Sequence, residues 1–119
     1  MRELQRAVKD FVDAREWETP GHMKDFLLNV CEECGEAWHI VKWVGTEKEA
    51  ELIEKHKAEM LDFVGDQLYL IMRIANISGV DAEEALKATL KEYEGRFPVK
   101  EIKGKHANLY AGGIDHKYN

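Results

Sequence analysis

Four stretches of the chain repeat apolar residues every three or four positions, and turn-forming residues separate them. The stretches cover residues 2–16, 20–43, 58–78 and about 82–96. This spacing places the apolar side chains on one side of an α-helix and the charged side chains on the other. The pattern therefore predicts an all-α protein.

Residues at the breaks are typical of helix ends. Thr19 is a suitable N-cap for the second helix, with Pro20 at the first helical position. Thr46 and Glu49 have the spacing of a capping box. Gly79 is expected to end the third helix. The charged stretch 47–57 is either the start of the third helix or a helix-loop.

The third helix combines an apolar surface with a narrow polar stripe. Apolar residues cover more than half of its circumference, which predicts burial on several sides. The stripe consists of Glu59, Asp62, Asp66, Tyr69 and Arg73. Its carboxylates repel one another unless a cation compensates them. Arg73 is placed to offset this charge, to pair with Asp66 or Tyr69, or to meet a substrate phosphate.

The second helix carries a matching acidic edge. Glu33 and Glu36 border its apolar arc and are surface neighbours, because they lie three residues apart. Glu32 is adjacent but points further away. Carboxylates that two helices present to each other form a site for a hard divalent cation, and Mg²⁺ prefers such oxygen ligands together with waters and phosphates. The pattern predicts a magnesium-dependent enzyme that acts on a phosphate-rich small molecule.

Composition narrows the class of protein. The 119 residues fit one domain, with 45% apolar and 34% charged residues. The net charge of −6 argues against binding of a nucleic-acid polymer. Apolar runs are too short for a membrane span, and the first residues lack a signal-peptide pattern. We expect a cytoplasmic protein.

The two cysteines, Cys31 and Cys34, form a single C-x-x-C sequence. A zinc site needs about four ligands, and no second such pair is present. Both cysteines fall on the apolar arc of the second helix. Packing in the core is therefore the favoured interpretation, with a site shared across a dimer axis as the alternative.

An ordered series of short motifs resembles one known family. The residues are Glu32-Glu33-Cys34-Gly35-Glu36, Val64-Gly65-Asp66-Gln67-Leu68-Tyr69, Gly79-Val80-Asp81 and Glu94-Gly95-Arg96-Phe97. Over residues 1–97 the chain resembles the MazG-like all-α nucleoside triphosphate pyrophosphohydrolases, with residues 98–119 left as a basic tail. The resemblance implies a four-helix bundle that assembles as a homodimer or a dimer of dimers. It also implies Mg²⁺-dependent conversion of a nucleoside triphosphate to the monophosphate and pyrophosphate, with Mn²⁺ as an alternative ion, in nucleotide house-cleaning.

Carried over by position, the resemblance makes Glu33 and Glu36 metal ligands and Asp66 the Asp of the second family motif, E-x-x-D. The Glu of that motif is replaced by Phe63. Asp62 lies four residues before Asp66 on the same helix face and is expected to take its place. Glu59 lies nearly one turn earlier, and for it a solvent-exposed role is favoured over metal binding.

The remaining site residues follow from the reaction. A carboxylate that coordination does not fully use, Glu32 or Glu36, is expected to accept a proton from the attacking water. Arg73 is the candidate for a phosphate contact and Trp38 for a contact with the base. Phe63 leaves one alternative open: a catalytically degenerate dimer that serves as a nucleotide-binding or protein-interaction module.

Overall fold

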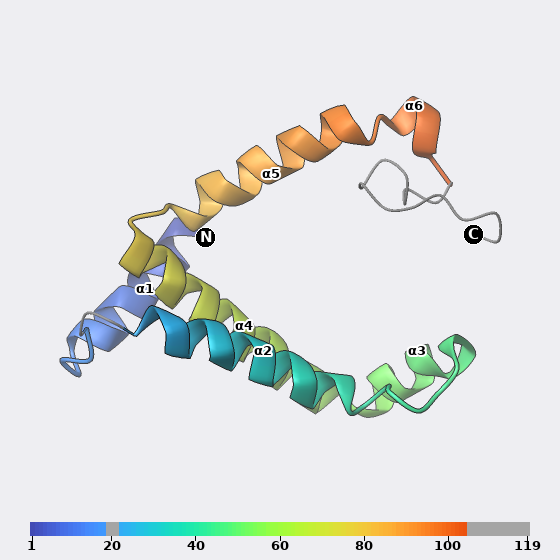
Figure 1. Ribbon diagram of the computed structural model, residues 1–119, viewed down its shortest axis with the longest axis horizontal. Helices are drawn as coiled ribbons and strands as arrows, with labels where there is room; N and C mark the ends of the chain where they lie inside the picture. The colour runs from blue at the N-terminus through green and yellow to red at the C-terminus, as the bar shows by residue number, and fades with distance from the viewer. Residues whose placement is uncertain (19–21, 105–119) are drawn as a thin grey trace. The chain divides into compact units, whose positions relative to one another are not determined.

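The computed structural model describes residues 1–18 and 22–104, and these residues form helices without any strand (Figure 1). The helices are α1 (Arg2–Asp13), α2 (Met23–Trp38), α3 (Thr46–Lys55), α4 (Lys57–Ser78), α5 (Ala82–Arg96) and α6 (Val99–Ile102). The expected all-α class is confirmed. The chain forms two compact units, Met1–Ala82 and Glu83–Asn119. The expected boundary at residue 97 stays a prediction.

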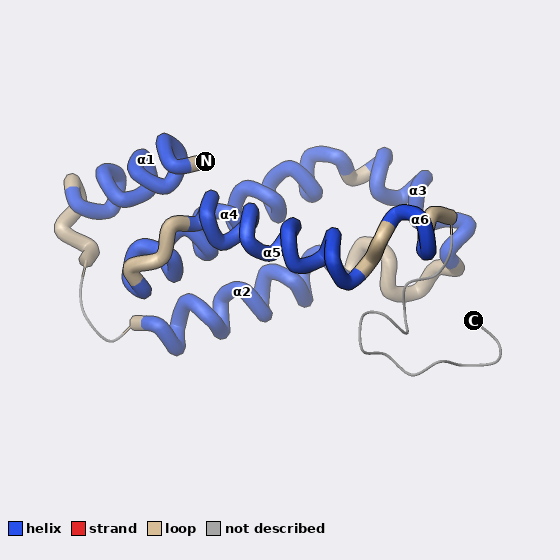
Figure 2. Tube along the Cα trace, turned by 90° about the horizontal axis from the view of Figure 1, so that it is seen from above, coloured by secondary structure: helices blue, strands red, loops and turns tan. Residues whose placement is uncertain are grey.

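Within the first unit, α2 and α4 form an antiparallel pair (Figure 2). Phe26 near the start of α2 lies against Arg73 near the end of α4, with 4.5 Å between the guanidinium carbon and the ring centre. Further along α2, the backbone oxygen of Val30 accepts a hydrogen bond of 3.1 Å from the side chain of Gln67. This pairing sets which acids of α2 face which acids of α4.

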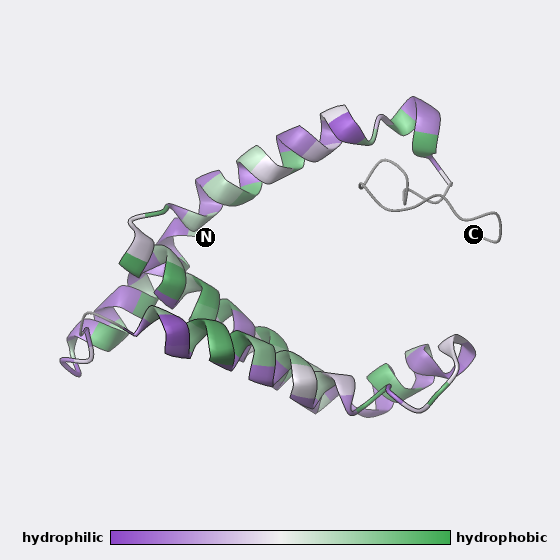
Figure 3. Ribbon diagram, viewed as in Figure 1, coloured by the Kyte–Doolittle hydropathy of each residue, from purple (hydrophilic) through white to green (hydrophobic). Residues whose placement is uncertain are grey.

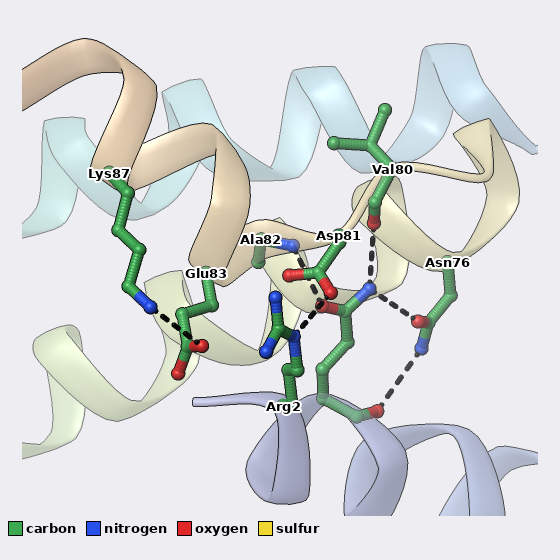
Figure 4. Close-up of polar contacts among 8 residues, drawn as sticks. Arg2, Asn76, Val80, Asp81, Ala82, Glu83 and Lys87 are labelled. Atoms are coloured by element: carbon green, nitrogen blue, oxygen red, sulfur yellow. Dashed lines mark hydrogen bonds and ion pairs between the residues drawn. The ribbon is translucent and has the colours of Figure 1, made fainter. Parts of the chain in front are cut away.

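Helix α1 is attached to the last turn of α4 by the side chain of Gln5. Its Nε2 donates to Oδ1 of Asn76 at 2.9 Å and to the backbone oxygen of Val80 at 2.8 Å. Its Oε1 accepts from the backbone N–H of Ala82 at 2.8 Å. Beside it, Nε of Arg2 lies 2.7 Å from Oδ2 of Asp81 (Figure 4). One side chain thus binds polar groups that the end of a helix leaves free.

Two helices are shorter than predicted. Helix α1 ends at Asp13 instead of residue 16, where Glu16 adopts a positive φ of 53°. This turn brings Trp17 edge-on against Phe11, with ring centres 5.9 Å apart. Helix α2 ends at Trp38 instead of residue 43, and hydrogen bonds to the third preceding residue tighten the chain that follows. Tertiary packing and turn hydrogen bonds therefore override the helical periodicity at both ends.

The helix-end predictions have mixed outcomes. The capping box is wrong: Gly45 is the N-cap of α3, and no side chain caps it. Gly79 ends α4, as predicted, and it does so in the left-handed conformation with φ of 66°. Helix α5 begins and ends at the predicted residues. Thr19 and Pro20 lie outside the described residues, as does the tail beyond residue 104, whereas α6 opens unexpectedly after Pro98.

The buried core of the described residues is small. Its hydrophobic members are Val12, Leu70, Met72 and Ala75. The prediction that α4 is buried on several sides is wrong within the chain, because much of its apolar surface is exposed. The prediction that Cys31 and Cys34 pack in the core is also wrong, since both are exposed. Among the described helices, none is long and apolar enough to cross a membrane.

Candidate functional site

A small cavity lies along one edge of the α2–α4 pair. Its volume is about 190 Å³. Four carboxylates and three apolar side chains line it: Glu33, Glu36, Glu59, Asp62, Ala37, Ile40 and Phe63. The sequence predicted that the acids of the two helices would meet, and the structure brings three of the four predicted metal ligands to this cavity.

The pKa of Glu33 reflects the acids around it. Glu33 is half-buried, whereas Glu36 and Asp62 are exposed. Partial burial raises the pKa of the Glu33 carboxyl above its ordinary value, because the charged form loses water. Negative charge nearby raises it further, in decreasing order from Glu36, Asp66, Asp62 and Glu32. Among the described residues, the charges that act on Glu33 are all negative.

Asp66, the fourth predicted ligand, is not part of the cavity wall. It lies four residues after Asp62 and so on the same face of α4, one turn along the helix. Its charge acts on Glu33 more strongly than that of Asp62 does. Asp66 thus extends the acidic edge beyond the cavity.

Glu59 lines the cavity, and its side chain is also exposed, as was favoured for it. A hydrogen bond from its own backbone N–H lowers the pKa of its carboxyl, and His56 lowers it further. Nδ1 of His56 lies 3.3 Å from its Oε1. The E-x-x-D spacing of Glu59 and Asp62 was the available signal, but local spacing does not show which turn of α4 faces Glu36.

Phe63 occupies the cavity wall at the position where the resemblance to the MazG-like enzymes implies a Glu. Together with Ala37 and Ile40 it forms the apolar part of the lining. At this position the cavity wall therefore has an aromatic ring beside its four carboxylates.

The donor chemistry fits Mg²⁺, which prefers oxygen ligands. Glu33, Glu36, Asp62 and Asp66 supply only carboxylate oxygens, from two helices, in a field that favours a cation. In residues 1–18 and 22–104, no three side chains of Asp, Glu, His or Cys converge on one point as they stand. Ion binding at this edge would require side-chain rotation, which the exposed Glu36 and Asp62 are free to make.

Two predicted site residues lie outside the cavity. Glu32 is exposed and adjacent to Glu33 but does not line the cavity. Trp38 lies two residues after Glu36, and residues at this spacing point to different sides of a helix. The Trp38 ring instead lies 5.4 Å from Nζ of Lys42. The Trp38 ring thus lies away from the acidic edge, where the base was expected to be bound.

Arg73 is 6% exposed and packs between the helices. Its Nη1 donates to the hydroxyl of Tyr69 at 3.2 Å, one of the predicted partners, and its guanidinium covers the ring of Phe26. Its Nε has no hydrogen-bond partner, and no carboxylate of the described residues pairs with it. A buried charge without a counter-ion is unfavourable. Seven residues, about 10 Å along the helix, separate it from Asp66.

A larger cavity of about 570 Å³ lies between α1 and α4. Apolar residues dominate its lining, which consists of Met1, Leu4, Ala7, Val8, Phe11, Gly65, Leu68, Tyr69 and Met72. No side chain of this lining supplies a carboxylate, amine or imidazole for chemistry. The acidic edge remains the candidate site.

One comparison with known proteins gives a match. A crystal structure of a pyrophosphatase from Archaeoglobus fulgidus superimposes with a TM-score of 0.69 and 25% sequence identity. The alignment covers 81% of this chain and 90% of that protein. No family model matches the sequence, and no curated protein matches it. The chain has a pyrophosphatase-like all-helical fold.

Proposed function

We propose that this protein is a pyrophosphatase-type hydrolase that converts a nucleoside triphosphate to the monophosphate and pyrophosphate. One observation carries the proposal: carboxylates from α2 and α4 gather at a single cavity. The likeness to the Archaeoglobus pyrophosphatase supports the reaction class. The motif series that resembles the MazG-like enzymes supports the choice of a nucleotide as substrate.

The chain's own residues have separate tasks in this reaction. Glu33, Glu36, Asp62 and Asp66 would hold Mg²⁺, which when bound supplies charge neutralisation and a more acidic water. Glu36 is exposed at the cavity and is suited to accept a proton, and Glu32 is the second candidate. Partial burial of Glu33 keeps one carboxylate in a fixed position against α4.

Substrate contacts complete the proposal. Arg73 is the proposed contact for an anion such as a phosphate at the far end of the polar stripe, because its Nε has no hydrogen-bond partner. Trp38 is the proposed aromatic partner of the base, and reaching it would require a substrate that extends around α2. The proposed role is nucleotide house-cleaning in the cytoplasm by a homodimer or a dimer of dimers.

Phe63 favours a second candidate function. Its ring stands in the cavity wall in place of a carboxylate, so the donor set is smaller than the family motif implies. The alternative is a catalytically degenerate dimer that binds nucleotides or another protein without turnover.

The test is a panel of standard and modified ribo- and deoxyribonucleoside triphosphates with Mg²⁺ or Mn²⁺, with the products resolved by chromatography. Glu36→Ala is the inactive variant, and Glu51→Ala, an exposed carboxylate of α3, is the matched control. Monophosphate and pyrophosphate from the wild type and from Glu51→Ala, but not from Glu36→Ala, are expected. Nucleotide binding without turnover across the panel would favour the degenerate module.

A further inference from the structure

The antiparallel pairing of α2 and α4 determines which side chains face each other along the acidic cavity. Phe26 of α2 lies against Arg73 of α4, and the backbone oxygen of Val30 accepts a hydrogen bond from the side chain of Gln67. A step forward on α2 therefore corresponds to a step back on α4.

Continued towards α3, this register brings Glu36 opposite Phe63 and Ile40 opposite Glu59. All four residues line the cavity of about 190 Å³. In Figure 3, the parts of α2 and α4 nearest to α3 carry both hydrophilic and hydrophobic residues, in keeping with this lining. The side chain that faces Glu36 is thus an aromatic ring and not an acid.

Glu59 is the acid next to this ring. It is a surface neighbour of both Phe63 and Asp62, because it precedes them on α4 by four and three residues. It lies at the end of the cavity away from Glu33, since the charges that act on Glu33 come from four other acids. Glu36 and Asp62 are exposed and free to rotate towards Glu59.

The side chain of His56 contacts the carboxylate of Glu59. Its Nδ1 lies 3.3 Å from Oε1 of Glu59. An ionised carboxylate only accepts hydrogen bonds, so Nδ1 of His56 carries the hydrogen in this contact. The His56 side chain is 35% exposed, against 59% for Glu59, so the more buried group holds the more exposed one.

The backbone of His56 is fixed by two helices, because this residue follows α3 and directly precedes α4. Its N–H donates to the oxygen of Leu52 at 2.9 Å, and its oxygen accepts from the N–H of Met60 at 3.0 Å. Carboxylates that bind metal ions commonly accept a hydrogen bond from a neighbouring group, which sets their orientation. His56 is such a group on a rigid part of the chain.

We propose that Glu59 is an additional ligand of the cation at this cavity, and that His56 is the positioning residue that orients it. The inference rests on the proposed function, because it needs a divalent cation at the acidic edge. Neither residue belongs to the motifs that carry the resemblance to the MazG-like enzymes. The carboxylate missing at Phe63 is supplied from the preceding turn of α4, and the donors remain the oxygen ligands that Mg²⁺ prefers.

The first experiment measures the binding of Mn²⁺ alone, without nucleotide, from the electron paramagnetic resonance signal of the free ion. It compares the wild type with Glu59→Gln and with Glu51→Gln, which removes an exposed carboxylate of α3. Glu59→Gln should bind Mn²⁺ at least about tenfold more weakly, and Glu51→Gln should stay within about twofold of the wild type. Wild-type affinity in Glu59→Gln would overturn the assignment.

The melting temperature without the ion separates cation binding from a role at the start of α4. Glu59 lies in the first turn of α4, where a Glu or Gln side chain can also bind free backbone N–H groups. Gln keeps this ability, so the ion-free melting temperature of Glu59→Gln should not fall below that of the wild type. Weaker Mn²⁺ binding that appears only together with a lower ion-free melting temperature would overturn the assignment.

A second substitution tests the same point by adding an acid at the neighbouring position. Glu59→Gln combined with Phe63→Glu keeps four carboxylates in the cavity wall. The double variant should bind Mn²⁺ at least about threefold more tightly than Glu59→Gln alone, because the two positions are coupled. No gain in affinity would contradict the proposal that Glu59 replaces the acid missing at Phe63.

Two variants of His56 test its positioning role. His56→Ala removes Nδ1, whereas His56→Asn keeps an amide nitrogen at nearly the same place. His56→Ala should bind Mn²⁺ at least about tenfold more weakly, and His56→Asn should stay within about threefold of the wild type. Equal weakening in both variants, or wild-type affinity in His56→Ala, would overturn this role.

The same measurements distinguish this inference from the proposed hydrolysis. Mn²⁺ binding that depends on Glu59, without turnover of any nucleotide, would overturn the hydrolysis alone. Turnover by a wild type whose Mn²⁺ binding does not depend on Glu59 would overturn this inference alone. A wild type that binds no Mn²⁺ would overturn both.

Discussion

The side-chain amide nitrogen of Gln67 lies 2.9 Å from Sγ of Cys34, and this contact joins the centres of α2 and α4. The same nitrogen donates to the backbone oxygen of Val30 at 3.1 Å. Gln67 stands next to Asp66, and Cys34 stands next to Glu33. The contact therefore sets the distance between two acids of the candidate site.

Gln67→Ala should lower the free energy of unfolding by about 1–3 kcal/mol, because it removes two hydrogen bonds and the packing of the side chain. Urea unfolding followed by circular dichroism measures the change. Gln67→Met is the matched control, since it keeps most of the volume and removes the buried Oε1 that has no partner. Equal losses in both variants would assign the effect to the hydrogen bonds, and no loss in either would contradict a role in pairing the helices.

Glu36→Ala should reduce kcat/KM at least about 100-fold, the lower range for loss of a catalytic acid or base. Its side chain is exposed, so helical content should stay unchanged. Pyrophosphate release and far-ultraviolet circular dichroism measure the two quantities. Wild-type turnover in this variant would remove Glu36 from the site.

Phe63→Glu should lower turnover at least tenfold if the ring shapes a working cavity, because it adds a fifth carboxylate to a wall that already has four. Phe63→Leu keeps the wall apolar and should retain activity within about threefold. Steady-state kinetics on the best substrate compare the two. A gain of activity in Phe63→Glu would instead identify Phe63 as the cause of degeneration.

Stability should depend on pH through Glu33. Its pKa is raised in the folded chain by burial and by the neighbouring acids, so the folded state binds the proton more tightly than the unfolded state does. Stability must then fall as the pH rises from the ordinary pKa of Glu through the raised value. Glu33→Gln should flatten this fall and raise the melting temperature at pH 7, as measured by thermal unfolding between about pH 4 and pH 7.

Mg²⁺ provides a second measurement on the same pair of proteins. An ion that binds the folded acids raises the melting temperature, because it binds the native state alone. The increase should be larger in the wild type than in Glu33→Gln. Identical increases would show that the ion binds elsewhere.

Local patterns were sufficient for some elements. Gly79 predicted the end of α4, and the helical spacing of residues 82–96 predicted both ends of α5 correctly. They were insufficient where packing outside the helical repeat matters. Helix α1 ends at Asp13, and after the turn at Glu16 the ring of Trp17 packs on Phe11, a contact that helical periodicity does not describe.

The candidate site shows the same limit. Spacing placed Glu33 and Glu36 on one face of α2, and Asp62 and Asp66 on one face of α4, because residues three or four apart share a helix face. That Glu59 also lines the cavity could not be predicted, because its place depends on how α2 and α4 align, and contacts such as that of Gln67 set this alignment. The periodicity of Cys31 identified an apolar side correctly but did not reveal that the chain leaves it uncovered.

The position of Glu59 has a consequence for how such a site tolerates change. A carboxylate reaches the cavity from the turn that precedes the motif position, about 6 Å along the helix axis from Phe63. In a straight pair of helices, side chains one turn apart on one helix face the same edge of its partner. An acid lost at one position can then be replaced at the next without any change in the backbone, so a motif read by strict spacing overlooks sites that have moved along the helix.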